Sequence, residues 1–150
     1  MTLGRYVSDL QSGDVFEPVT FVITAAVART FCHGFEETSE WFHAAGTDRP
    51  QLVPPTTIHT TKMRLLKKNC PAGDGPFPKL VVEYDATHHG AIPADVPLVA
   101  SGQVVERYEK RGRDYVHTQV ELRLAADGRL LVSYSDRMLL RHEPGRAATP

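Results

Sequence analysis

The chain has 150 residues, of which 41% are hydrophobic, so it is long enough for one domain with a real core and too short for two to be expected. Its 17 Lys and Arg oppose 18 Asp and Glu, and a net charge of -1 gives no electrostatic reason to expect a nucleic-acid or membrane partner. The two cysteines lie outside any CxxC pair, which favours free thiols. The sequence shows no apolar leader and no run of about 18 apolar residues, so a cytoplasmic protein is expected.

The first part of the chain is expected to hold an arm, an extended segment and two helices. Residues 1–14 form the arm, and residues 15–23 have the pattern of extended chain. Thr24 is placed to cap a helix that Gly34 ends, and residues 35–46 could form a second short helix.

The best-delimited helix is expected after Pro54 and Pro55, which exclude helix up to their own position. Thr56 or Thr57 can cap this helix, and the pattern then runs for roughly three turns before Pro71. Apolar side chains recur at helical spacing, and the cations are expected to form a solvated face toward the C-terminal end; the cations are Lys62, Arg64, Lys67 and Lys68.

The clearest β pattern lies in the second half of the chain. Residues 79–87, 98–110, 115–124 and 130–141 are expected to be strands, and Asp127-Gly128 is typical of a hairpin turn. Within 115–124 the side chains alternate, so one face is expected to be buried and the other wet; the buried side chains are Val116, Thr118, Val120, Leu122 and Leu124. One apolar helix is therefore available for one antiparallel sheet to wrap, which predicts an α+β domain over residues 1–150, with a core of about 15–141 and a tail of 142–150.

One residue of the last predicted strand breaks its apolar face. Asp136 alternates with apolar side chains, and a carboxylate on an apolar face needs a partner or a function. A β-bulge that turns Asp136 outward is the simpler explanation.

The order of these elements resembles that of the MaoC-like hot-dog dehydratases and hydratases. The resemblance covers about residues 13–141 and is carried by Ile23-Thr24 through Phe31-Cys32, by Pro54-Pro55-Thr56, by Val104 to Gly112 and by Asp127 to Val132. It implies a curved antiparallel sheet wrapped around a central helix, and edge-to-edge pairing into a homodimer or a heterodimer with another hot-dog subunit. It also implies acyl thioester substrates carried on coenzyme A or acyl carrier protein (ACP), and no cofactor is expected.

The hydratase motif of that family is altered in this chain. The family has Gly-Asp-any-Asn-Pro-any-His after the first helix, where Asp and His flank the water that is added or removed. Glu37 keeps a carboxylate at the matching position, but Phe42 replaces the histidine and His43 lies one residue further. On a helix one residue is a rotation of about 100°, so the acid and the base do not carry over directly. The departure resembles subunits of this family that bind the acyl chain while a partner supplies catalysis.

His59 is the favoured histidine, because it lies in the first turn of the central helix. There, backbone N–H groups polarise a thioester carbonyl and an imidazole acts as acid or base. The alternative is a histidine that bonds only to a nearby backbone carbonyl. The candidate catalytic residues are therefore Glu37, His59 and His43, and the candidate substrate-binding residues are Thr56, Thr57, His88, His89 and Trp41. The seven histidines have no metal-ligand spacing, so no metal site is expected.

Three functions remain open from the sequence. The chain could be a dehydratase or hydratase of 3-hydroxyacyl and 2-enoyl thioesters, a thioesterase on the same scaffold, or a non-catalytic acyl-binding subunit. The overall likeness to dehydratases favours the first.

Overall fold

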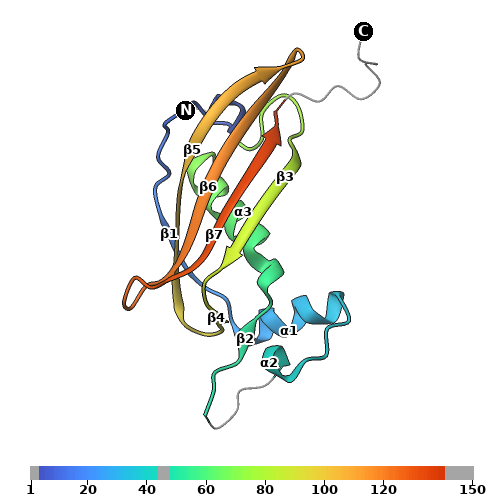
Figure 1. The fold of residues 1–150 in the computed structure, drawn as a ribbon, viewed down its shortest axis with the longest axis vertical. Helices are drawn as coiled ribbons and strands as arrows, with labels where there is room; N and C mark the ends of the chain where they lie inside the picture. Colours follow the sequence, from blue (N-terminus) through green and yellow to red (C-terminus); the bar gives the residue numbers. More distant parts are fainter. Residues whose placement is uncertain (1–3, 44–47, 141–150) are drawn as a thin grey trace.

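A curved antiparallel sheet lies against one long helix in the computed structural model, which describes residues 4–43 and 48–140 (Figure 1). The helix is α3, and the sheet has five strands in the order β1-β5-β6-β7-β3, with a separate pair β2-β4. The elements are the 3-10 turn Val7–Asp9, β1 Val19–Val22, α1 Ala25–Gly34, α2 Glu40–His43, β2 Leu52–Val53, the 3-10 turn Pro55–Thr57, α3 Ile58–Asn69, β3 Leu80–His88, β4 Ile92–Pro93, β5 Pro97–Lys110, β6 Arg113–Leu124 and β7 Leu130–Leu139.

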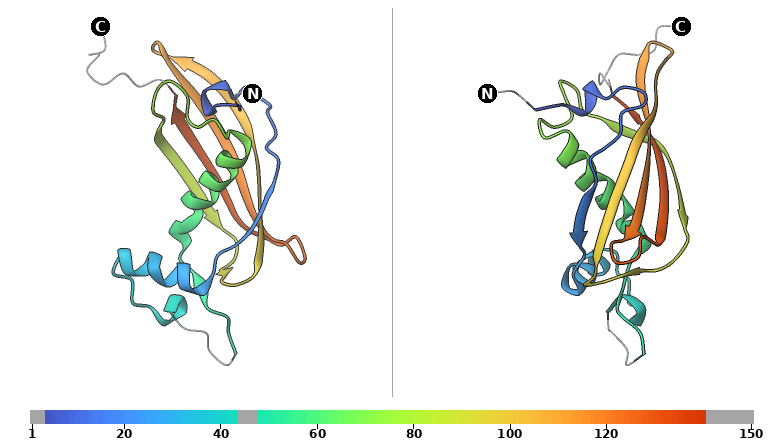
Figure 2. Two further views of the ribbon diagram at one scale, coloured as in Figure 1. Left: turned by 180° about the vertical axis from the view of Figure 1, so that it is seen from behind. Right: turned by 90° about the vertical axis from the view of Figure 1, so that its left-hand side faces the viewer.

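The buried face of the sheet is formed by the three long strands β5, β6 and β7. Along β6 alternate residues are fully buried, and they are Val116, Thr118, Val120 and Leu122. This alternation confirms the predicted two-faced strand. Figure 2 shows the sheet bending around α3, so the core forms between the inner face of β5, β6 and β7 and the apolar side of the helix.

The central helix begins differently from the prediction. A 3-10 turn precedes α3, and the Thr57 hydroxyl donates to the carbonyl of Pro54 at 2.8 Å instead of capping the helix. The hydrogen bonds of this tighter turn take the place of a side-chain cap at the start of the helix. Leu65 and Leu66 are buried under the sheet, as the helical spacing predicts.

The helix cap at Thr24 is confirmed, because its hydroxyl accepts the backbone N–H of Val27 at 3.2 Å. α1 ends at Gly34 as expected, and α2 covers four residues of the predicted second helix. Residues 44–46 of that helix, and the predicted tail 142–150, lie outside the described residues. Within residues 4–43 and 48–140, no helix is long and apolar enough to cross a membrane.

The prediction for Asp136 is wrong, and so is the prediction for one of the four helix cations. Asp136 points inward and is 1% exposed, and Lys62 is 2% exposed instead of solvated. The two form an ion pair beneath the sheet. Each charge compensates the other for the loss of hydration, so the Asp136 carboxylate can stay on the buried face. No β-bulge is required to turn it outward.

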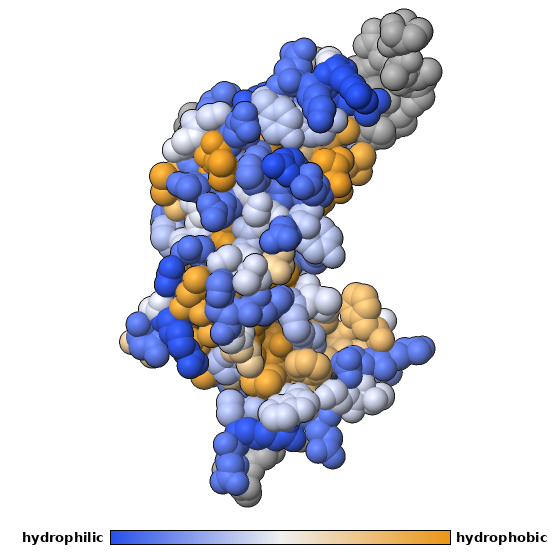
Figure 3. All heavy atoms as spheres, in the orientation of Figure 1, coloured by the Kyte–Doolittle hydropathy of each residue, from blue (hydrophilic) through white to orange (hydrophobic). Residues whose placement is uncertain are grey.

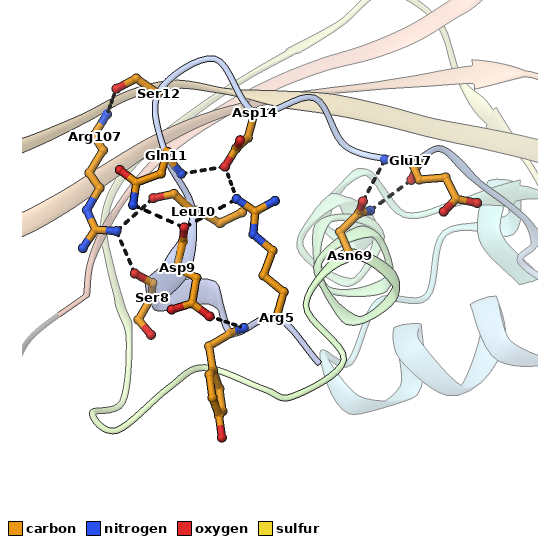
Figure 4. A network of polar contacts seen from close by, with 11 residues as sticks. Arg5, Ser8, Asp9, Leu10, Gln11, Ser12, Asp14, Glu17, Asn69 and Arg107 are labelled. Carbon is orange, nitrogen blue, oxygen red and sulfur yellow. Dashed lines mark hydrogen bonds and ion pairs between the residues drawn. The ribbon is translucent and has the colours of Figure 1, made fainter. Parts of the chain in front are cut away.

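The N-terminal arm is fastened to the body by polar contacts (Figure 4). The Arg107 guanidinium donates to the carbonyls of Ser8 and Leu10 at 2.7 and 2.9 Å. Just after the arm, the Glu17 backbone N–H donates to the Asn69 side chain at 2.7 Å, which ties the segment that follows the arm to the end of α3. Within the arm, the Asp14 carboxylate pairs with Arg5.

Asp14→Asn is expected to destabilise the protein at pH 7 by about 1 kcal/mol, with the loss vanishing in acid. The Gln11 backbone N–H, ahead of the Arg5 guanidinium, lowers the pKa of Asp14 below its ordinary 3.8. A carboxyl with a lowered folded pKa stabilises fully above its unfolded pKa, and this stability is lost as the pH falls through the folded value. Urea unfolding at pH 7 and between pH 4 and pH 2 measures the difference.

The matched control is Asp85→Asn, at an exposed aspartate of β3, which should leave the free energy of unfolding nearly unchanged at every pH. Equal behaviour of the two variants would contradict the role assigned to Asp14.

Candidate functional site

His59 lies in the first turn of α3, beside two stacked tyrosines that come from neighbouring strands. Its ring is nearly perpendicular to the rings of Tyr84 on β3 and Tyr134 on β7, with ring centroids 4.7 and 5.5 Å apart. Nδ1 of His59 lies 3.2 Å from the Tyr134 hydroxyl. The imidazole is half-buried and Tyr84 is 59% exposed, so the ring is held on its inner side and reachable from the outer side.

Behind Tyr134 the polar contacts continue into the core. The Tyr134 hydroxyl donates to Oδ2 of Asp136 at 3.3 Å, and the Thr118 hydroxyl donates to Oδ1 at 2.5 Å. The Lys62 ammonium pairs with Oδ2. Burial, and then the charge of Asp136, raise the pKa of Tyr134 well above its ordinary value, so its hydroxyl stays protonated. A continuous chain therefore runs from a buried ion pair to a reachable imidazole.

Glu37 lies in the loop after α1 and His43 at the end of α2, both on the overhang, residues 35–43, and both bond to backbone. The Glu37 carboxylate accepts the Ser39 N–H at 2.8 Å, and Nε2 of His43 lies 2.5 Å from the Glu37 carbonyl oxygen. Beside them Trp41 is 53% exposed, and the Arg49 guanidinium lies over its ring at 4.1 Å. In this arrangement the two side chains hold the overhang in shape instead of facing one another.

A pocket of about 290 Å³ contains two further predicted residues. His88 and His89 line it, together with Phe42 and Pro55. Nε2 of His89 lies 3.0 Å from the Ser133 hydroxyl. Of the two predicted threonines, Thr57 is buried with its hydroxyl bonded to Pro54, and Thr56 is exposed.

The predicted site residues thus lie in three separate places: the start of α3, the overhang and the pocket of His88 and His89. Among them, His59 is connected by hydrogen bonds to a buried charge. Figure 3 shows a hollow between the body and the protruding α1 segment, and in Figure 1 the start of α3 lies at that level. Lys62, Tyr84 and Tyr134 were not predicted. A signal for Lys62 was present, because it follows His59 by three residues and such residues share one side of a helix.

The described residues offer no metal site. Over residues 4–43 and 48–140, no group of three or more His, Cys, Asp and Glu side chains is arranged to hold an ion. Both cysteines are buried, and burial raises the pKa of the Cys32 and Cys70 thiols, which makes them poor nucleophiles at neutral pH.

No protein-family model matches the sequence, and a search of curated proteins finds no match. Solved structures do match. The HadBC (3R-hydroxyacyl-ACP dehydratase) complex from Mycobacterium tuberculosis aligns with a TM-score of 0.71 and 17% identity, over 85% of this chain and 96% of that chain. R-hydratase PhaJ1 from Pseudomonas aeruginosa aligns with a TM-score of 0.72 and 13% identity, over 98% of this chain and 94% of that chain.

A MaoC-like dehydratase from Rhodospirillum rubrum aligns with a TM-score of 0.67 and 15% identity, over 94% of this chain and 99% of that chain. The three alignments cover 85% to 98% of this chain and 94% to 99% of the matched chains, so they compare the fold over most of each chain. The chain therefore has the hot-dog fold of the MaoC-like dehydratases and (R)-hydratases.

Proposed function

We propose that the protein adds water to 2-enoyl thioesters, or removes it from 3-hydroxyacyl thioesters, with the acyl group carried on coenzyme A or acyl carrier protein. The observation that carries the proposal is His59, a half-buried imidazole at the start of the central helix, linked through Tyr134 to the buried Asp136. Structural neighbours with this fold include an enzyme that acts on 3R-hydroxyacyl-ACP and an (R)-hydratase.

One imidazole is sufficient for the proton transfers of this reaction. In hydration, Nε2 of His59 takes a proton from water while the hydroxyl oxygen bonds to C3 of the enoyl group. The electron pair of the double bond moves toward the thioester carbonyl, and the imidazolium then returns the proton to C2. Dehydration is the reverse, with the C2 proton taken first and water leaving from C3. No redox partner is needed, because one water supplies both added groups, the hydroxyl on C3 and the hydrogen on C2.

A second hot-dog subunit is the proposed protein partner. β3 lies at an edge of the sheet, and four of its apolar or aromatic side chains are 42% to 59% exposed; they are Leu80, Val81, Val82 and Tyr84. An exposed, apolar edge strand is a template for pairing with another chain. The neighbouring HadBC structure is a complex, which supports a homodimer or heterodimer here.

The overhang favours a second candidate, a non-catalytic acyl-binding subunit. Phe42 replaces the motif histidine, and Glu37 and His43 bond to backbone at the place where the family's pair flanks a water. In this case the partner subunit would supply the acid and the base.

Incubation of the purified chain with crotonyl-CoA and with 3-hydroxybutyryl-CoA is expected to interconvert the two, because the proposed base needs only water and thioester. Mass spectrometry detects the gain or loss of one water, and a thiol reagent in the same tube detects free coenzyme A. Gain or loss of water with no thiol released is the expected result.

The other outcomes are equally specific. Released thiol would show a thioesterase, and no change until another hot-dog subunit is added would show the non-catalytic role. The same sample is examined by sedimentation velocity, where a monomer at micromolar concentration would contradict the pairing through β3.

A further inference from the structure

We propose that Tyr134, oriented by the Lys62–Asp136 ion pair, is a positioning residue that holds His59 in the tautomer with its proton on Nδ1. Nε2 is then left as a free proton acceptor. The tautomer follows from contacts within the chain, whereas its use in water addition rests on the proposed function.

The first step is the direction of the bond between Tyr134 and Asp136. Asp136 pairs with the Lys62 ammonium and also accepts the Thr118 hydroxyl. A carboxylate has acceptor sites only, so a hydroxyl that contacts it must donate. The Tyr134 hydroxyl lies 3.3 Å from Oδ2 and is therefore the donor.

The second step is the bond between Tyr134 and His59. Tyr134 carries one hydroxyl proton, and its neutral form is favoured by burial. That proton goes to the carboxylate, because hydrogen bonds to a charged acceptor are stronger than those to a neutral one. The oxygen lone pairs remain for His59, whose Nδ1 lies 3.2 Å away and must donate. The bond that one ring nitrogen makes decides which nitrogen carries the proton, so Nε2 is unprotonated in the neutral ring.

The third step is the orientation of the ring. Tyr84 and Tyr134 both meet the His59 ring edge to face, at interplanar angles of 82° and 85°. Across residues 4–43 and 48–140, no protein group bonds to Nε2 of His59. The chain of contacts thus fixes both the proton and the plane of the imidazole, and it leaves one nitrogen for a water or a substrate.

The test measures the ring nitrogens directly. Long-range proton–nitrogen NMR correlation on the full chain with 15N-labelled histidine separates a protonated from an unprotonated ring nitrogen, and the missing signals in His59→Gln assign His59. In the wild type we expect a protonated Nδ1 and an unprotonated Nε2. Tyr134→Phe removes only the hydroxyl, so the Nδ1–H preference should be lost and kcat for crotonyl-CoA should fall at least about tenfold with KM nearly unchanged.

Thr118→Val is the matched control, because it also deletes one hydrogen bond to Asp136 but lies off the path to His59. It should keep the wild-type tautomer. A wild-type His59 protonated on Nε2, or a Tyr134→Phe protein with the wild-type tautomer, would overturn the proposal whether or not the protein turns over thioesters. The Nδ1–H tautomer in a protein without thioester turnover would support this proposal and reject the proposed function.

Discussion

His59→Ala is expected to lower turnover of crotonyl-CoA by about 10²- to 10⁴-fold, the usual contribution of one acid–base group. The alanine removes the only proposed proton acceptor, and the core behind it keeps the Lys62–Asp136 pair. Steady-state kinetics measures the loss, and circular dichroism checks that the fold is retained.

His117→Ala is the control for a histidine of similar exposure. His117 lies on β6, where its Nε2 is 2.8 Å from the Ser135 hydroxyl, and it has no role in the proposed reaction. Its loss should change turnover less than about twofold. A protein that is active with His59→Ala but inactive with Glu37→Ala would place the chemistry on the overhang, as the resemblance to dehydratases implies.

Asp136→Ala is expected to destabilise the protein by about 3–5 kcal/mol, because it leaves the Lys62 ammonium without a partner in the core. The double variant Lys62→Met with Asp136→Val removes both charges together and should recover most of that stability. Urea unfolding followed by circular dichroism gives the free energies.

The next residue of the same strand provides the comparison. Arg137 pairs with Glu83 at 2.7 Å on the exposed side of the sheet, and Arg137→Ala should cost less than about 1 kcal/mol. If Asp136→Ala costs no more than Arg137→Ala, or if the double variant is as unstable as Asp136→Ala, the ion pair does not contribute as described.

The sequence by itself determined the elements and their faces, because these depend on local chemistry and spacing. Three of these signals act within a few residues: the two prolines before α3, the cap at Thr24 and the alternation along β6. The helices α3 and α1, and the buried and solvent-facing sides of β6, were therefore predictable. The order of these elements was sufficient to indicate the hot-dog fold.

Only the tertiary structure decided the polar interior. Lys62 and Asp136 are 74 residues apart in the chain, and each was assigned to a solvated position because an isolated charge is costly to bury. That cost is offset when α3 and β7 pack together, since the fold places the Lys62 ammonium and two hydroxyls against the Asp136 carboxylate. The same packing brings Tyr134 to His59, so the partner that sets the histidine's proton arises from a long-range contact that no local pattern encodes.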